Sequence, residues 1–136
     1  MDDRKYLHRN ERLSLQKDIN RLFESGHRFV SFPFQIIYLK NEKDPVNDSG
    51  VSVLICVPKK RIRKAVKRNY IKRLIRESFR INKSEISTLY KQKGEQLHIA
   101  FIYICNEIKL YNDVEKAILK ALNLIQKKIL LPHSTH

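Results

Sequence analysis

The sequence predicts a single α+β domain in which helices cover a small mixed sheet. Three observations support this class. The chain of 136 residues has the length of one ordinary domain. Hydrophobic residues make up 42% of it and glycine and proline are rare, so it is expected to fold. Helical and strand-like patterns follow one another in the order helix, strand, strand, helix, strand, helix.

The first predicted helix covers residues 14–25. Apolar side chains recur there at helical spacing, Ser14 can cap the start of the helix, and Gly26 can end it. The residues before it are polar and basic and lack apolar periodicity. The expected organisation is a flexible basic arm at 1–13, one domain at 14–130 and a tail at 131–136.

Two strands are expected to follow this helix. The first, at 29–40, alternates: apolar residues from Phe32 to Tyr38 share one face, and Ile37 lies on the other. The second, at 51–57, is apolar on both faces, which is typical of a central strand covered on both sides. A polar segment rich in turn-forming residues joins them.

The second half of the chain alternates between helix and strand. A basic helix is expected over 65–81, and residues 85–90 are expected to add a further turn or two. A buried strand at 97–105 and an amphipathic helix at 114–129 complete the domain.

Composition and motifs exclude several classes of protein. No CxxC pair, histidine-rich metal spacing or glycine-rich phosphate loop occurs, so no catalytic residue, metal ligand or protein-bound cofactor is predicted. Cys56 and Cys105 lie in apolar runs and are expected to be buried free thiols in a reducing compartment. No segment reaches the ~18 apolar residues of a spanning helix. The N-terminus also lacks the apolar core of a secretory signal, so we expect a cytoplasmic protein.

The basic helix indicates a polyanionic partner. The chain has 28 basic and 14 acidic residues, a net charge of +14. Basic side chains recur every four residues from Arg68 to Arg80, although like charges at this spacing oppose helix formation. Nucleic acid therefore explains this face better than solvent does, while Asn69 fits a base edge or an ordinary surface amide equally well. The predicted RNA-binding residues are Lys59, Lys60, Lys64, Arg68, Asn69, Lys72, Arg73, Arg76 and Arg80.

The segment KKRIRKAVKRNYIKRLIRESFR, residues 59–80, resembles the signature of the bacterial ribonuclease P protein component. The pattern Ala-Val-x-Arg-Asn-x-x-Lys-Arg-x-x-Arg-x-x-Phe-Arg is matched from Ala65 to Arg80. Upstream, LSLQKDINRLFESGHRF resembles the first helix of the family. Tyr70 stands where the family usually has Arg, and Ile19 stands where Phe is common.

The resemblance implies a protein that is not itself the catalyst. It would form a 1:1 complex with ribonuclease P RNA, and that RNA would use Mg²⁺ to remove the 5′ leader of precursor tRNA. The leader would follow a cleft between the first helix and the sheet, where Ile19, Phe23 and Tyr38 match the family by position; Phe23 fits the core equally well. The resemblance also implies a left-handed crossover through the basic helix, against the usual preference.

Other partners explain the charge less well. The main alternative is a structural, ribosome-associated type of RNA-binding protein with no role in tRNA processing, which would not require Arg68 and Asn69 followed by Lys72 and Arg73. Helix-turn-helix binding to DNA is disfavoured because no second helix at a short turn precedes residues 65–81. A membrane-surface helix is disfavoured because the core needs its apolar face. An autonomous nuclease is disfavoured because no carboxylate cluster suits two metals.

Overall fold

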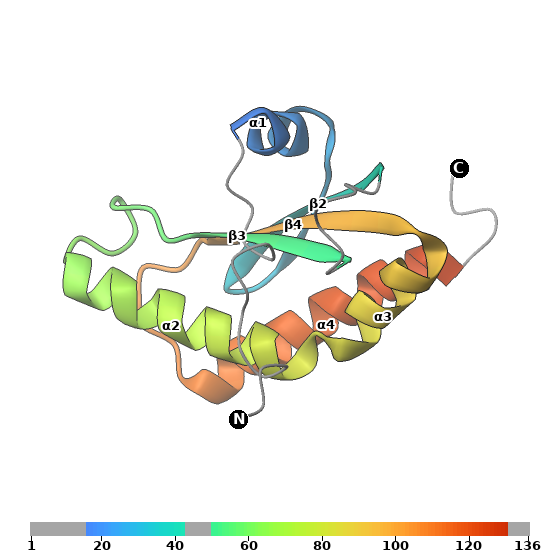
Figure 1. Cartoon of the computed structure of the whole chain (residues 1–136). Helices are drawn as coiled ribbons and strands as arrows, with labels where there is room; N and C mark the ends of the chain where they lie inside the picture. Colours follow the sequence, from blue (N-terminus) through green and yellow to red (C-terminus); the bar gives the residue numbers. More distant parts are fainter. Residues whose placement is uncertain (1–15, 43–49, 131–136) are drawn as a thin grey trace, which may run out of the picture.

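The computed structural model describes residues 16–42 and 50–130 (Figure 1). The predicted arm and tail, Ser14 and most of the polar segment before the second predicted strand lie outside these ranges. The elements in chain order are α1 (Gln16–Ser25), β1 (His27–Ser31), β2 (Phe34–Glu42), β3 (Val51–Cys56), α2 (Ala65–Asn82), α3 (Ser84–Lys93), β4 (Glu95–Tyr103) and α4 (Tyr111–Leu130).

The strands of the described ranges form one mixed sheet in the order β1-β2-β4-β3. β1 pairs with β2 and β2 with β4 in antiparallel register, whereas β3 runs parallel to β4. Parallel neighbours need a crossover connection. The chain supplies it with α2 and α3, which lie between β3 and β4 in sequence. The handedness of this crossover stays a prediction.

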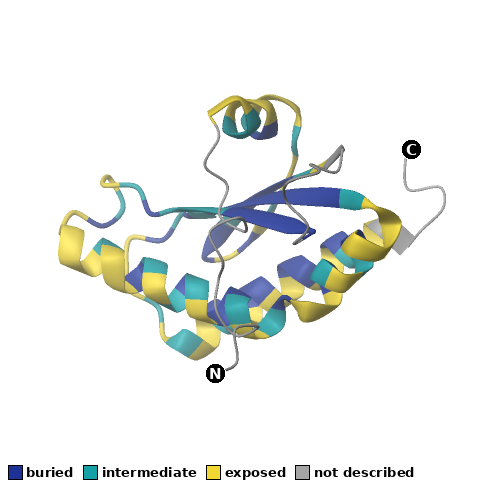
Figure 2. Cartoon of the chain, in the orientation of Figure 1, coloured by how far each residue is buried: buried dark blue, intermediate teal, exposed yellow. Residues whose placement is uncertain are grey.

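Helices cover the two faces of the sheet unequally. In Figure 1, α2, α3 and α4 lie along one side of the sheet and α1 lies on the other. The larger core is on the three-helix side and includes the fully buried Phe79 and Phe101. A smaller cluster of Leu22, Ile37 and Ala100 joins α1 to the opposite face. Figure 2 accordingly shows buried residues along the strands and on the inner sides of α2 and α4.

The first predicted strand proves to be a hairpin of two strands. The chain reverses at Phe32 and Pro33, and Ser31 pairs with Phe34 across the turn. Phe32 lies in this turn with 59% of its surface exposed, so the prediction that it shares the buried face of Phe34 is wrong. The physical reason is that residues paired across a two-residue turn, such as Ser31 and Phe34, share a face although they are three apart. The alternation therefore changes parity at the turn, and a pattern extended from Phe34 back to Phe32 assigns Phe32 to the wrong place.

β3 lies at the edge of the sheet, so its predicted central position is wrong. Its apolar run has another cause. Val53 belongs to the larger core, while Leu54 packs against the smaller cluster on the opposite face. Helices of both layers thus cover this edge strand, and burial on two faces selects apolar residues wherever the strand lies in the sheet.

The remaining elements agree closely with expectation, with one extension. The turn or two expected at 85–90 is the ten-residue helix α3. It ends at Gly94, whose φ of 69° is the left-handed conformation that glycine adopts without strain. Both cysteines are free thiols, as predicted. Cys105 is buried as expected, whereas Cys56 is only half-buried. None of the helices described is long and apolar enough to span a membrane.

Candidate nucleic-acid interface

Helix α2 has one apolar side, which fixes the orientation of its basic side. Ile71, Ile75 and Phe79 are fully buried and anchor the helix in the larger core. As an apolar residue of the predicted helix, Ile81 is expected on this side too, but 52% of its surface is exposed. Ile81 follows Phe79 by two residues, which is about 200° around the helix, so the two side chains cannot share one side. Tyr70 is 43% exposed and lies at the border of the two sides.

The predicted RNA-binding residues fall into two groups on one continuous surface. They share α2 and the loop that enters it, and Figure 2 shows this end of α2 as largely exposed. The half-buried group is Arg68, Lys72, Arg76 and Arg80, and the exposed group is Lys59, Lys60, Lys64, Asn69 and Arg73. The row at four-residue spacing therefore lies along the flank of the helix, and Asn69 and Arg73 lie on its outermost side.

Arg68 is held by the loop that precedes α2. Its Nη1 donates hydrogen bonds to the carbonyl oxygens of Ile62, at 3.1 Å, and Arg63, at 2.6 Å. Ile62 is buried and fastens the same loop to the core. Arg68 thus fixes the path of a loop that carries Lys59, Lys60 and Lys64, in addition to any contact with RNA. No pattern in the sequence indicates this second role.

Two other side chains on α2 are also positioned by neighbours. The guanidinium carbon of Arg73 lies 5.9 Å from the centroid of the Tyr70 ring, a cation–π arrangement that orients the exposed arginine. Arg80 forms an ion pair with Glu77, one turn earlier. This pair reduces the net positive charge at the C-terminal end of the helix, so the field for an anion is stronger toward its start.

The start of α2 adds to this field. Its N-cap residue, Lys64, makes no side-chain capping hydrogen bond, and the first turn contains no acidic residue. The backbone N–H groups of a first turn lack partners within the helix and form the positive end of its dipole. The lysines and the positive end of the helix dipole therefore both attract anions to the start of α2.

The second predicted site lies where α1 crosses the sheet. Ile19 and Phe23 are half-buried on α1 and pack beside Leu22 of the smaller cluster, together with Leu39 and Leu54 of the sheet. Their partial exposure leaves an apolar margin between α1 and the strands. Phe23 is thus partly core and partly surface, which combines the two interpretations that the sequence left open.

Tyr38 does not share this margin, so its prediction as a third cleft residue is wrong. Alternation along β2 directs Tyr38 to the three-helix side, where it belongs to the larger core and is only 7% exposed. Its ring contacts those of His27 and Phe29, and Lys128 Nζ lies 5.9 Å from its centroid. Ile37 and Leu39 are the β2 residues that meet α1. The predicted alternation already separated Tyr38 from Ile37, so the signal was present.

His98 is a further polar residue beneath α1 that the sequence analysis did not single out. It lies on β4 opposite Leu39 and is 3% exposed, and its Nδ1 is buried without a hydrogen-bond partner in the part of the chain that the structure describes. Burial lowers the pKa of His98 from the ordinary 6.5, and the charges of Asp18 and Arg21 on α1 act in opposite directions. A histidine inside an apolar strand was the available signal. Among the described residues, no three His, Cys, Asp or Glu side chains group closely enough to hold a metal ion.

The fold and the basic side of α2 define a small α+β protein whose surface suits a polyanion. The family model described as Ribonuclease P matches residues 7–124, and the chain belongs to the ribonuclease P protein family. This confirms the resemblance on which the sequence analysis relied, and with it the α+β fold class.

Relatives from two bacteria agree with this assignment. The chain is 38% identical over 116 residues to the ribonuclease P protein component of Porphyromonas gingivalis strain W83, covering 85% of this chain and 83% of that protein. It is 31% identical over 106 residues to the protein of the same description from Syntrophus aciditrophicus, covering 75% and 84%.

Solved structures show the same fold. The ribonuclease P protein of Thermotoga maritima superimposes with a TM-score of 0.65 at 28% identity, covering 84% of this chain and 96% of that one. The Staphylococcus aureus protein gives a TM-score of 0.62 at 22% identity, covering 85% and 95%, and supports the fold alone. The mixed sheet and its covering helices are therefore a shared architecture.

Proposed function

We propose that this chain is the protein subunit of a ribonuclease P, in which it binds the RNA subunit and the 5′ leader of precursor tRNA. The observation that carries the proposal is the basic side of α2, with the half-buried Arg68 on its flank and the exposed Asn69 beside it, in a chain of this family. The protein acts in the cytoplasm as one copy per RNA, and the RNA subunit performs the hydrolysis.

The basic side of α2 contacts the RNA subunit in this proposal. Arg73 projects from the outermost side of the helix and presents a planar guanidinium to phosphate oxygens, which it can contact with two hydrogen bonds. Asn69 lies one turn earlier and can both donate to and accept from a base edge or a 2′-hydroxyl. Lys59, Lys60 and Lys64 supply further charge from the entry loop, which Arg68 holds in place.

The leader follows the apolar margin between α1 and the sheet. Ile19 and Phe23 offer half-exposed apolar surface there, and unpaired bases stack on such surfaces without regard to sequence. Arg21 on the exposed side of α1 supplies charge for the leader phosphates. Because Tyr38 faces the other layer, the proposed margin is completed by Leu39 and Leu54.

The protein contributes binding and charge to the reaction. Mg²⁺ supplies the metal chemistry when bound to the RNA-containing holoenzyme. A protein of net charge +14 displaces counterions that the folded RNA would otherwise hold, and so reduces the salt needed to keep the RNA compact.

Reconstitution tests this function and separates it from general RNA binding. The protein is mixed with a bacterial ribonuclease P RNA at low Mg²⁺, and the release of the 5′ leader from precursor tRNA is measured. We expect cleavage at the mature 5′ end only when both components are present. The structural RNA-binding alternative would be favoured if the protein binds the RNA but does not lower the Mg²⁺ concentration that the RNA needs for cleavage by itself.

A further inference from the structure

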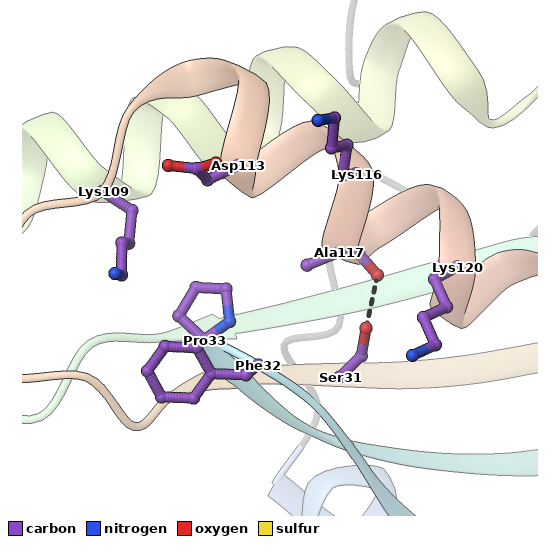
Figure 3. Close-up of a pocket in the computed structure, with 8 residues that line it drawn as sticks. All are labelled: Ser31, Phe32, Pro33, Lys109, Asp113, Lys116, Ala117 and Lys120. Atoms are coloured by element: carbon purple, nitrogen blue, oxygen red, sulfur yellow. Dashed lines mark hydrogen bonds between the residues drawn. The ribbon is translucent and has the colours of Figure 1, made fainter.

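A hollow of about 400 Å³ lies between the β1–β2 turn and the start of α4, away from both surfaces described above. Its lining includes Phe32 of the turn and the lysines Lys109, Lys116 and Lys120. Figure 3 shows Lys109 beside Phe32 and Pro33, and Lys120 on the other side of Ser31. A neighbouring hollow of about 460 Å³ shares Lys116 and Lys120 and extends along α4 to Lys127. We refer to the two together as the α4 groove.

Hydrogen bonds from the core hold the walls of the α4 groove in place. Ser31 Oγ donates to the carbonyl oxygen of Ala117 at 2.8 Å and fastens the turn to α4 (Figure 3). The carbonyl oxygen of Pro33 accepts from the Ile104 N–H at 2.8 Å on the other side of the turn. The Lys109 N–H donates to the hydroxyl of the buried Tyr103 at 3.1 Å. Both walls are thus fixed before any ligand arrives.

Phe32 is a large apolar side chain that the fold leaves exposed instead of burying it in the core. Its side chain sits at the tip of a hairpin with 59% of its surface in contact with solvent, and Lys109 Nζ lies 5.4 Å from the ring centroid. An exposed aromatic ring beside a cation is a platform on which an unpaired base can stack while its phosphate meets the charge.

The lysines of α4 form a row on one side of the helix. Lys116, Lys120 and Lys127 fall within an arc of about 40° at 100° per residue. Neighbouring like charges oppose the helix, and none of the three forms an ion pair with a described residue. The carboxylate in the groove, Asp113, is in the first turn of α4, where its negative charge stabilises the helix by interacting with the positive end of the helix dipole. The row spans roughly 16 Å along the helix axis, at about 1.5 Å per residue from Lys116 to Lys127.

We propose that the α4 groove binds an unpaired segment of the RNA subunit, with a base stacked on Phe32 and the following phosphates along the α4 lysines. This inference rests on the proposed function. The RNA subunit is favoured over the leader because the groove lies on the three-helix side of the sheet, as α2 does, whereas α1 and its apolar margin lie on the other side (Figure 1).

The test measures RNA binding by two variants, Phe32→Ala and the double variant Lys109→Ala/Lys120→Ala. We expect Phe32→Ala to raise the Kd for the RNA subunit about 5- to 100-fold, the range typical for loss of one stacked base. The double variant should reduce the slope of log Kd against log salt by about 1.4, since two phosphate contacts are lost. Thermal unfolding checks that both variants fold, which the exposure of Phe32 predicts.

Matched controls separate this proposal from the proposed function. Leu110→Ala removes an exposed apolar side chain outside the groove, and Lys93→Ala removes an exposed lysine of α3; neither should change binding. If Arg73→Ala weakens binding and both groove variants bind as wild type, the groove proposal fails while the proposed function stands. If Arg73→Ala also binds as wild type, the proposed function itself is wrong.

Two further measurements identify the occupant. The preference of the holoenzyme for precursor over mature tRNA reports on the leader, and Phe32→Ala should leave this ratio unchanged. A loss of the ratio with normal binding of the RNA subunit would assign the groove to the leader and overturn the proposal. Binding to vesicles containing anionic lipid that depends on Phe32, with unchanged RNA binding, would overturn it in favour of a membrane surface.

Discussion

Individual arginines on α2 divide their work between folding and binding. Arg68 donates hydrogen bonds to the carbonyl oxygens of Ile62 and Arg63, whereas Arg73 is exposed and lies beside the ring of Tyr70. Residues with the same charge in one motif therefore have different structural roles. Substitutions at the two positions should separate stability from affinity.

We expect Arg73→Ala to weaken binding of the RNA subunit by about 1–3 kcal/mol with an unchanged melting temperature, because a charge-assisted contact is lost from an exposed position. Arg68→Ala should weaken binding and also lower the melting temperature, since the loop carbonyls lose their donor. Filter binding and thermal denaturation measure the two effects. Lys93→Ala is the control, and equal stability losses in both arginine variants would contradict the assignment.

His98 should make stability depend on pH. Burial lowers the pKa of His98 in the folded protein below the ordinary 6.5 of the unfolded chain. Its contribution to stability is therefore complete above about pH 6.5 and is lost as the pH falls from there through the folded-state pKa. Urea denaturation between pH 7.5 and 5 should show the free energy of unfolding decreasing with acidity.

Substitution identifies the group responsible for this decrease. His98→Gln should flatten the pH dependence in that range, whatever its effect on stability at pH 7.5. His27→Gln, which removes an exposed histidine of β1, should keep the decrease of the wild type. A decrease of the same size in both variants would assign it to other groups.

One close approach, of Gly26 to Leu22 and Ile37, determines where α1 lies on the sheet. Gly26 ends α1, and its N–H donates to the carbonyl oxygen of Leu22 at 2.8 Å. A Cβ at this position would lie 2.4 Å from that oxygen and 2.6 Å from Ile37 Cγ2. Absence of a side chain at Gly26 therefore lets α1 pack down on β2, which sets the apolar margin beside Ile19 and Phe23.

We expect Gly26→Ala to destabilise the fold by roughly 1–3 kcal/mol, as overpacking usually does, because the clash with backbone cannot be relieved without moving α1. Leader affinity, measured as the preference of the holoenzyme for precursor over mature tRNA, should fall in parallel. Binding of the RNA subunit through α2 should be retained. Ser25→Ala, one residue earlier and exposed, should change none of these; a Gly26→Ala protein with normal leader preference would refute the close-approach argument.

At the scale of the whole molecule, the positive charge is spread over two layers. α2 and the α4 groove carry it on the three-helix side, and α1 adds Arg21 on the opposite side. This distribution suits a protein that lies between an RNA subunit and a substrate strand. Long-range attraction by a net charge of +14 should make association fast and strongly dependent on salt.

We expect the protein to lower the Mg²⁺ concentration at which the RNA subunit cleaves precursor tRNA, because its charge replaces counterions around the folded RNA. The protein freed of RNA should release no leader at any Mg²⁺ concentration. Cleavage rates measured across a Mg²⁺ titration, with and without protein, provide the check. Robust cleavage by nuclease-treated protein would contradict the assignment of catalysis to the RNA subunit and of binding to the protein.

The sequence by itself determined the elements that depend on local pattern and the motif that carries the function. The bounds of α2 agree with the predicted helix within a residue, and the apolar run of β3 correctly indicated cover on both faces. The motif that contains Arg68 and Asn69 indicated the ribonuclease P protein family, which the family model confirms. Periodicity, capping and composition act between residues close in the chain, so they can be read without knowing the rest of the fold.

Only the tertiary structure decided which faces meet and which charges are available. Alternation separated Tyr38 from Ile37, but the packing of α1 against Ile37 determined which of them borders the proposed leader path. The α4 groove likewise depends on tertiary structure. The hairpin tip exposes Phe32, and the hydrogen bond from Ser31 to Ala117, 86 residues away, holds that tip against α4. These outcomes depend on contacts between distant segments, which compete for one core, and local patterns carry no information about that competition.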